Sequence, residues 1–272
     1  MRIITDSLNG KVVILLLQDG KILQNVRVAK DIYEMVLEAP EIVKSSKPGQ
    51  FVNLKLSEKL DPLLRRPISL HRIDADRGTL ALLYLVVGKG TAMMSRMEPG
   101  ETLNVLGPLG NGWDCALPGQ HAVLVGGGIG IAPLYPLAKA LTAAGKQVSL
   151  IMGAKNSAYL TDGTDYAQLG VEVCTATDDG SADTPGLVTA PLQQLIAAGR
   201  CDLIYACGPV PMLRAVEETA LAHGIPGQVS TEAHIGCGLG VCLLCPNKVK
   251  SGGYKRTCVD GPVFAIGELD YA

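Results

Sequence analysis

Four cysteines near the C-terminus have the spacing of metal ligands. Cys237, Cys242 and Cys245 follow the pattern C-x4-C-x2-C, and Cys258 comes after twelve further residues. This is the plant-type ligand spacing, in which four thiolates hold a 2Fe-2S cluster. The pattern therefore predicts an iron-sulfur cluster on these four side chains, and with it the transfer of single electrons.

Glycines alternate with the first ligands, and they indicate a loop and not a helix. Gly236, Gly238 and Gly240 can adopt the positive φ values that a backbone needs to wrap around a cluster. A tetrahedral zinc site is one alternative, but such sites usually pair two C-x2-C knuckles, and only Cys242 and Cys245 form one here. A disulfide framework is the other, and it is typical of small secreted chains. The spacing favours the cluster.

The composition indicates a globular protein of more than one domain. A chain of 272 residues fits two domains and a short cluster-bearing module. With 47% hydrophobic and 18% charged residues it is not a disordered chain, and a net charge of -2 gives no reason to expect nucleic-acid binding. The apolar run 12–17 is too short for a signal peptide or a membrane span. We expect a cytoplasmic protein that binds neither nucleic acid nor membrane.

The other four cysteines have no ligand spacing. In a reducing compartment they should remain free thiols, and burial as small apolar side chains is the expected role. They are Cys115, Cys174, Cys201 and Cys207.

Two sequence patterns divide the chain. Between residues 22 and 106, runs of strand length alternate with Pro-Gly, Asp-Pro and Arg-Gly turns, which predicts an antiparallel β barrel. From residue 121 onward, apolar strands alternate with helices, which predicts a doubly wound α/β domain with a parallel sheet. The predicted units are an N-terminal extension (1–20), the barrel (21–118), the α/β domain (119–228) and the cluster module (229–272).

A glycine-rich turn follows the first strand of the α/β domain. Its backbone N-H groups could bind a pyrophosphate, as in dinucleotide-binding folds. Pro133 takes the third glycine position of the usual motif, so a tight turn without a ligand is the alternative. A second strand end facing the same crevice favours the ligand. The candidate nucleotide-binding residues are Gly127, Gly128 and Gly130 in the turn, and Cys207, Gly208 and Pro209 at the second strand end.

These pieces together resemble the ferredoxin-NADP reductase superfamily of flavoproteins. The segment 48–51 (PGQF) is similar to its barrel strand, and Arg66, Pro67, Ile68 and Ser69 are similar to its R-x-Y-S flavin motif. The resemblance implies that Arg66 pairs with an FAD phosphate and that Ser69 bonds the flavin, with Ile68 in place of the stacking tyrosine. A surface charge beside Arg65 is the alternative for Arg66. A second flavin segment is implied at Leu83, Tyr84, Leu85, Gly90 and Thr91.

With the cluster included, the chain resembles the electron-transfer subunits of NAD-dependent dihydroorotate dehydrogenases over nearly its whole length. The motifs are RPIS, VGKGT, GPLGNGW, TDDGS, ACGP and a cluster loop that begins at Glu232. The resemblance implies three redox groups, which are FAD, the 2Fe-2S cluster and NAD(H) as co-substrate. Nicotinamide exchanges a hydride and a cluster exchanges one electron, so a flavin is needed between them. No catalytic acid or base is expected on this chain.

The resemblance also implies a partner. Dihydroorotate would be oxidised on a separate FMN-containing catalytic subunit, within a heterotetramer of two of each subunit. Apolar residues in the cluster loop predict a partly exposed docking surface, with a buried structural tail as the alternative. These residues are Ile235, Leu239, Val241, Leu243 and Leu244.

Other functions fit some of these motifs. A related iron-sulfur flavin oxidoreductase, of the NADH-dependent ferredoxin-NADP reductase or sulfur reductase type, has the same parts. The loop from Glu232 favours the pyrimidine enzyme, while Lys155 and Asn156, where an acidic ribose-binding residue is usual, leave NAD or NADP open. An iron-sulfur redox sensor is a third hypothesis, which the intact RPIS and GKGT motifs disfavour. His234 is a candidate neighbour of the cluster.

Overall fold

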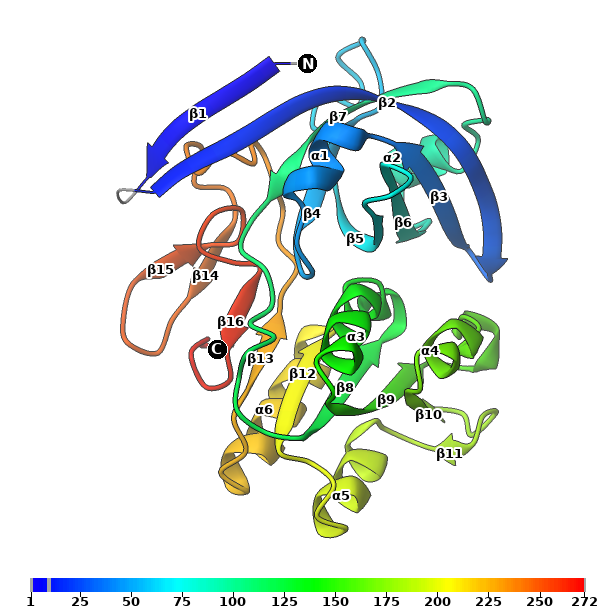
Figure 1. Ribbon diagram of the computed structural model, residues 1–272, viewed down its shortest axis with the longest axis vertical. Coiled ribbons are helices and arrows are strands. Elements are labelled where there is room, and N and C mark those ends of the chain that lie inside the picture. The colour runs from blue at the N-terminus through cyan, green and yellow to red at the C-terminus, as the bar shows by residue number, and fades with distance from the viewer. Residues whose placement is uncertain (1, 9–10, 272) are drawn as a thin grey trace.

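The computed structural model describes residues 2–8 and 11–271, and the side chains of residues 15–271 (Figure 1). A barrel and an α/β domain lie one above the other, and the C-terminal segment runs along the side where they meet. No helix among the described residues is long and apolar enough to span a bilayer.

The first sheet is a closed antiparallel barrel. The sheet follows the order β1-β2-β3-β6-β5-β4-β7. Pairing of β2 with β7 closes β2 to β7 into the barrel, and β1 pairs with β2 outside it. Alternate side chains point inward, so that Met35 and Leu37, or Leu80 and Leu82, are fully buried. The elements are β1 (Arg2–Leu8), β2 (Lys11–Ala29), β3 (Ile32–Glu38), α1 (Pro40–Ser45), β4 (Phe51–Lys55), β5 (Arg66–Asp74), β6 (Thr79–Leu85), α2 (Lys89–Met94) and β7 (Thr102–Leu109).

The long strand β2 pairs with three other strands. Its first part pairs with β1, residues 16–21 pair with β7, and residues 21–29 pair with β3. The predicted boundary at residue 20 therefore lies inside a continuous strand, because the hydrogen bonds that close the barrel begin before it.

The second sheet is doubly wound. Strand order is β11-β10-β9-β8-β12-β13-β16, and all neighbours are parallel except β13 and β16. The order reverses between β8 and β12, which is where open α/β sheets bind ligands. The elements are β8 (His121–Gly127), η1 (Gly128–Ile131), α3 (Leu134–Ala143), β9 (Gln147–Ala154), η2 (Ser157–Tyr159), α4 (Thr164–Gln168), β10 (Glu172–Thr177), β11 (Thr184–Pro185), α5 (Thr189–Ala197), β12 (Leu203–Cys207), α6 (Val210–Ala222) and β13 (Gly227–Ser230).

The C-terminal module is attached to both domains. It contains a hairpin of β14 (Pro246–Lys248) and β15 (Tyr254–Arg256), and β16 (Val263–Ala265) extends the α/β sheet. Asn111, which follows the last barrel strand, donates to the carbonyls of Asp260 (3.0 Å) and Val263 (2.8 Å) and accepts from the Val263 N-H. This explains the asparagine of the GPLGNGW motif.

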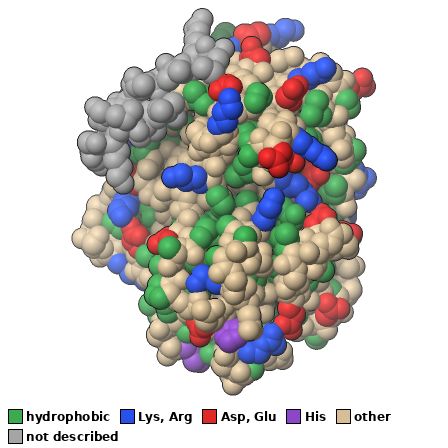
Figure 2. All heavy atoms as spheres, viewed as in Figure 1, with side chains coloured by type: hydrophobic (Ala, Val, Ile, Leu, Met, Phe, Trp, Pro, Cys, Tyr) green, Lys and Arg blue, Asp and Glu red, His purple; other side chains and the backbone are tan. Residues whose placement is uncertain are grey.

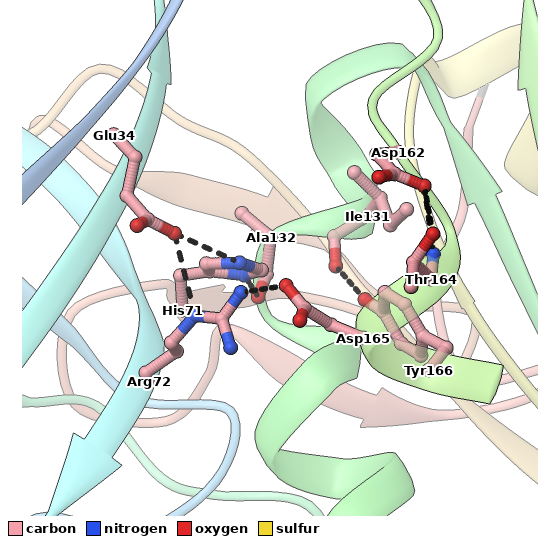
Figure 3. Close-up of polar contacts among 9 residues, drawn as sticks. All are labelled: Glu34, His71, Arg72, Ile131, Ala132, Asp162, Thr164, Asp165 and Tyr166. Atoms are coloured by element: carbon pink, nitrogen blue, oxygen red, sulfur yellow. Dashed lines mark hydrogen bonds and ion pairs between the residues drawn. The ribbon is translucent and has the colours of Figure 1, made fainter. Parts of the chain in front are cut away.

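Barrel and α/β domain meet at a polar network on β5 (Figure 3). His71 is buried, and its Nδ1 lies 3.0 Å from the carbonyl oxygen of Ala132, directly after the glycine turn. Because a carbonyl only accepts, Nδ1 carries the proton. Arg72 binds Glu34 (3.3 Å) on the barrel and Asp165 on α4. The strand that carries the RPIS motif is thereby tied to the glycine turn.

Aromatic residues complete this junction. The Arg72 guanidinium lies 4.4 Å from the centre of the Tyr135 ring, and the Tyr166 O-H donates to the Ile131 carbonyl at 3.0 Å. Trp113 donates from Nε1 to the Pro133 carbonyl. Figure 2 shows hydrophobic side chains along the middle of this face, with charged side chains around them. Polar contacts to backbone carbonyls thus fix the glycine turn relative to the barrel.

Burial lowers the pKa of His71. The unfolded chain takes up this proton near pH 6.5, whereas the folded chain takes it up only at lower pH. The contribution of neutral His71 to stability is therefore complete above about pH 6.5 and is lost as the pH falls below it, with a slope of at most about 1.4 kcal/mol per pH unit.

We expect His71→Gln to flatten this acid-side loss of stability. Denaturant unfolding of wild type and variant at pH 7 and 5.5 measures the effect, with His223→Gln, at the exposed end of α6, as the matched control. An identical pH dependence in wild type and His71→Gln would contradict the assignment.

Candidate functional site

A cavity of about 590 Å³ lies at the junction of all three parts of the chain. Its walls come from β5, β6 and α2 of the barrel, from η1 and the end of β12, and from the C-terminal module. It brings together ten of the residues that the sequence predicts to bind cofactors. These are Arg66, Pro67, Ile68, Ser69, Leu83, Tyr84, Leu85, Thr91, Gly130 and Cys207.

Three of the predicted glycines allow close contacts at this wall. A Cβ at Gly90 would lie 2.2 Å from Nε of Arg66, so only glycine leaves room for the guanidinium. A Cβ at Gly130 would lie 2.2 Å from the carbonyl oxygen of Cys207, and one at Gly127 would lie 2.9 Å from Cδ of Pro209. Glycine here permits close approach of the turn to the end of β12. The predicted residues that do not line the cavity are Gly90, Gly127, Gly128, Gly208 and Pro209.

Arg66 has donors available for a ligand. Its Nη1 donates to the Leu64 carbonyl at 2.6 Å and lies 3.3 Å from the Arg65 carbonyl oxygen, while Nε and Nη2 have no acceptor among the described residues. A half-buried guanidinium with free donors at a cavity wall suits a phosphate group. Arg65 is different, because it is bound to the carbonyls of Asn53 and Asn104 and to the Asn104 side chain. The two arginines therefore have separate roles.

Thr91, in the predicted second flavin segment, has a structural role. Its hydroxyl accepts from the N-H groups of Val87 (2.9 Å) and Gly88 (3.3 Å) at the start of α2. Tyr84 also lines the cavity, and its O-H donates to Asn25 at 2.9 Å inside the barrel. The cavity wall is thus held rigidly by the barrel core.

The far end of the cavity carries a thiol and a carboxyl. Burial, together with the charge of Glu232, raises the pKa of Cys207 to about 12, so Cys207 is a neutral thiol at physiological pH. Desolvation raises the pKa of Glu232. A neutral thiol beside an apolar wall positions a ligand and is not a nucleophile.

Sequence reasoning missed a large part of this wall. The C-terminal module contributes a continuous segment, and Glu232 at the head of the cluster motif was the signal that could have indicated it. His234, predicted as a cluster neighbour, lines the cavity. The missed residues are Phe51, Val87, Ile129, Ala132, Pro133, Ser230, Thr231, Glu232, Ala233, His234, Ile235, Thr257 and Pro262.

The four predicted ligand cysteines form two pairs. Cys237 and Cys242 exchange contacts, with each backbone N-H directed at the other's sulfur at 3.4 and 3.5 Å. The sulfurs of Cys245 and Cys258 lie 3.3 Å apart. The second pair is buried, whereas Cys242 is exposed. The hairpin of β14 and β15 holds Cys245 and Cys258 together, since the Thr257 N-H donates to the Cys245 carbonyl.

This arrangement fits a cluster with two irons better than a zinc ion. Among the described residues, no three His, Cys, Asp or Glu side chains are grouped for a single ion. A 2Fe-2S cluster takes two cysteines on each iron, which matches two pairs. Desolvation opposes ionisation of Cys237, but N-H groups of Cys242, Leu239 and Val241 lower the pKa of its thiol to about 7. An incipient thiolate is thus stabilised before metal binds.

The loop glycines divide into two kinds. Gly238 and Gly240 have φ of 74° and 78°, as the sequence predicted for a loop around a cluster. Gly236 does not, and its function is close approach, because a Cβ there would lie 3.0 Å from the Cys242 sulfur. Leu243 takes a positive φ of 56° without being glycine.

None of the eight cysteines forms a disulfide. Cys201 and Cys207 are buried, as predicted, whereas Cys115 and Cys174 are only half-buried. Lys155 is exposed.

Comparisons with known proteins decide the family. A family model for the iron-sulfur cluster binding domain of dihydroorotate dehydrogenase B matches residues 232–270, and one for an oxidoreductase NAD-binding domain matches residues 124–218. The dihydroorotate dehydrogenase B (NAD(+)) electron transfer subunit of Desulforamulus reducens is 40% identical over 90% of this chain and 95% of its own length. That of Geobacillus sp. is 43% identical over 89% of this chain and 94% of its own length. The chain belongs to the family of dihydroorotate dehydrogenase B electron transfer subunits.

Solved structures agree with the fold. An NADH-dependent reduced ferredoxin-NADP oxidoreductase is 33% identical, with a TM-score of 0.83 over 93% of this chain and 90% of that one. A ferredoxin reductase of carbazole 1,9a-dioxygenase shares the fold, with a TM-score of 0.66 at 20% identity over 78% of this chain and 67% of that one. The predicted barrel, doubly wound sheet and C-terminal cluster module are confirmed.

We expect Cys242→Ser to abolish the iron content and the visible cluster bands while FAD remains bound, because the residues that line the cavity do not include Cys242. Iron analysis and the flavin spectrum of the purified variant measure both. Cys174→Ser, a half-buried cysteine in β10, is the control. Full iron retention in Cys242→Ser would show that the ligand set is wrong.

We expect Arg66→Ala to weaken FAD binding about tenfold to hundredfold, since it removes a charge-assisted contact worth about 1.5–3 kcal/mol. The FAD dissociation constant, measured by fluorescence after flavin removal, is the test. Arg77→Ala, at an exposed turn, should bind FAD as wild type does. An unchanged FAD dissociation constant for Arg66→Ala would show that Arg66 is a surface charge and does not bind FAD.

Proposed function

We propose that this chain carries electrons between a partner dehydrogenase, which oxidises dihydroorotate to orotate, and NAD, by way of a 2Fe-2S cluster and FAD. One observation carries the proposal. A single cavity has the RPIS strand on one wall, the glycine turn and the end of β12 on another, and the start of the cluster module on a third. Such a cavity supports a flavin in reach of both a nicotinamide and a cluster.

The parts of the chain divide the work in this proposal. Residues 21–118 would hold FAD, residues 119–228 NAD(H), and residues 229–272 the cluster, while the segment 1–20 precedes the flavin-binding part. FAD, when bound, exchanges a hydride with nicotinamide and single electrons with the cluster. Arg66 and Ser69 would anchor the flavin, and the turn at Gly130 would hold the nucleotide near Cys207.

In this proposal Cys207 is not a nucleophile. The raised pKa of Cys207 keeps its thiol protonated, and its neighbours are mostly apolar. The chain therefore contributes binding, orientation and exclusion of water. This agrees with a dihydroorotate site on another chain.

The cluster loop supports a docking surface for that partner. Val241 is 74% exposed, Leu243 66% and Leu244 48%, next to the exposed ligand Cys242. Contiguous exposed apolar residues mark interaction surfaces. Ile235 and Leu239, which were predicted to belong to this surface, pack inward instead, against the barrel side of the loop. We propose that the FMN-containing subunit covers residues 241–244, in an assembly of two copies of each subunit.

A second candidate function is that of an NADH-dependent ferredoxin-NADP oxidoreductase subunit. The 33% identity and TM-score of 0.83 with such an enzyme favour it. Identities of 40–43% with dihydroorotate dehydrogenase B subunits favour the first candidate. The electron donor accepted by the assembled enzyme distinguishes the two.

We expect the isolated chain to oxidise NADH with ferricyanide and to leave dihydroorotate unchanged. Addition of the FMN-containing subunit should give NAD-linked orotate formation, measured by absorbance. Turnover of dihydroorotate by the chain alone, or no complex with that subunit, would contradict the proposal. Leu243→Asp should weaken the complex, while Leu187→Asp, equally exposed on the α/β domain, should not.

A further inference from the structure

Asn53 is a fully buried polar side chain without a partner. Neither its Oδ1 nor its Nδ2 has a hydrogen-bond partner. Among the described residues, no other side chain has buried polar atoms without a partner. Unpaired buried amides are costly and rare in native proteins, and each points to a redox role or to a bound group. Asn53 lies in β4.

One side of this amide faces the cluster loop. A Cβ placed on Gly238 would lie 3.3 Å from Nδ2 of Asn53 and 3.0 Å from Cδ1 of Leu109. Gly238 directly follows the ligand Cys237, whose sulfur already accepts from the Leu239 N-H at 3.2 Å. The amide nitrogen therefore contacts the loop at the turn that presents Cys237.

On one side, β4 pairs with β5, whose RPIS motif lines the cavity. In the pairing of β4 with β5, Asn53 stands opposite Pro67 and Phe51 opposite Ser69. Phe51, two residues before Asn53 and on the same face of the strand, lines the cavity and also packs in the apolar cluster that contains Cys245 and Cys258. Strand β4 thus separates the RPIS motif from the cluster loop.

The surroundings of the amide do not suit a bridging water. A buried water needs two to four polar partners. The other side chains that a Cβ at Gly238 would contact are apolar, namely Leu109 and Leu106. Among the predicted cluster ligands, Cys237 directly precedes Gly238 in the loop. Sulfur of an iron-sulfur cluster accepts hydrogen bonds, and those bonds set its reduction potential.

We propose that Nδ2 of Asn53 donates a hydrogen bond to sulfur of the cluster unit, either a bridging sulfide or the Cys237 ligand, and so raises the cluster's reduction potential. The inference rests on the proposed function, since it needs the cluster. The reduced cluster carries one more negative charge than the oxidised one, so an N-H donor stabilises the reduced form more. Asn53 is a positioning residue between the flavin strand and the cluster, and not a ligand.

The test is the midpoint potential of the cluster in the full-length, FAD-loaded chain. It is measured by a redox titration in which EPR monitors the reduced cluster. Asn53→Leu removes the donor and keeps a similar volume. We expect the equilibrium for one-electron reduction to fall about tenfold, which is a shift of about 59 mV to lower potential. The FAD potential should stay as in wild type. Asn104→Leu is the matched control, because that barrel amide is already bonded to Asp19 and Arg65.

A second measurement covers a variant that does not take up iron. In the cluster-free chain the wild-type amide has no partner, so cluster-free Asn53→Leu should unfold at the same temperature as wild type or higher. Failure to take up iron combined with such stability supports the proposal. A lower unfolding temperature would show that the amide has a protein partner, and would overturn it.

Different results would contradict this inference and the proposed function. An unchanged potential in iron-loaded Asn53→Leu overturns this inference alone. A wild-type chain that takes up no iron overturns the proposed function as well.

Discussion

The attachment of the C-terminal module is the constraint on which the rest of the structure depends. This segment of about forty residues has strands of only three residues each, too little to bury a core of its own. It is held by the pairing of β16 with β13 and by the three hydrogen bonds of Asn111. Because these contacts come from both larger domains, the cluster loop has one position relative to each of them.

The cavity follows from that attachment. Residues 230–235 leave β13 and pass along the cavity before the first cysteine, so one wall of the cavity and the start of the cluster loop are one continuous segment. A second junction, between His71 and the carbonyl of Ala132, fixes the glycine turn relative to the RPIS strand. Burial lowers the pKa of His71 and so favours the neutral ring, which donates from Nδ1 to this carbonyl.

Features with a local cause could be predicted from the sequence. The cysteine spacing singled out four predicted ligands, which the structure brings together in two pairs. The change from short turn-linked strands to alternating strands and helices identified the two domains. Positive φ at Gly238 and Gly240 follows from the need to wrap a backbone, which is also local.

Features that depend on tertiary placement could not be predicted. Nothing in the sequence near Ser230 or His234 indicates a cavity wall, because that role depends on where β13 ends beside the barrel. Ile235 and Leu239 are as apolar as Val241, yet they turn inward because the barrel lies on their side of the loop. Asn53 is an ordinary strand residue until its neighbours are known.

The central claim is that flavin is the required link between nicotinamide and cluster on this chain. Stopped-flow mixing of NADH with the oxidised chain, before and after removal of FAD, tests it most directly through the visible bands of the cluster. The account predicts bleaching of these bands in the flavin-loaded chain, none in the flavin-free chain, and recovery when FAD is restored. Equal rates of cluster reduction with and without FAD would contradict it.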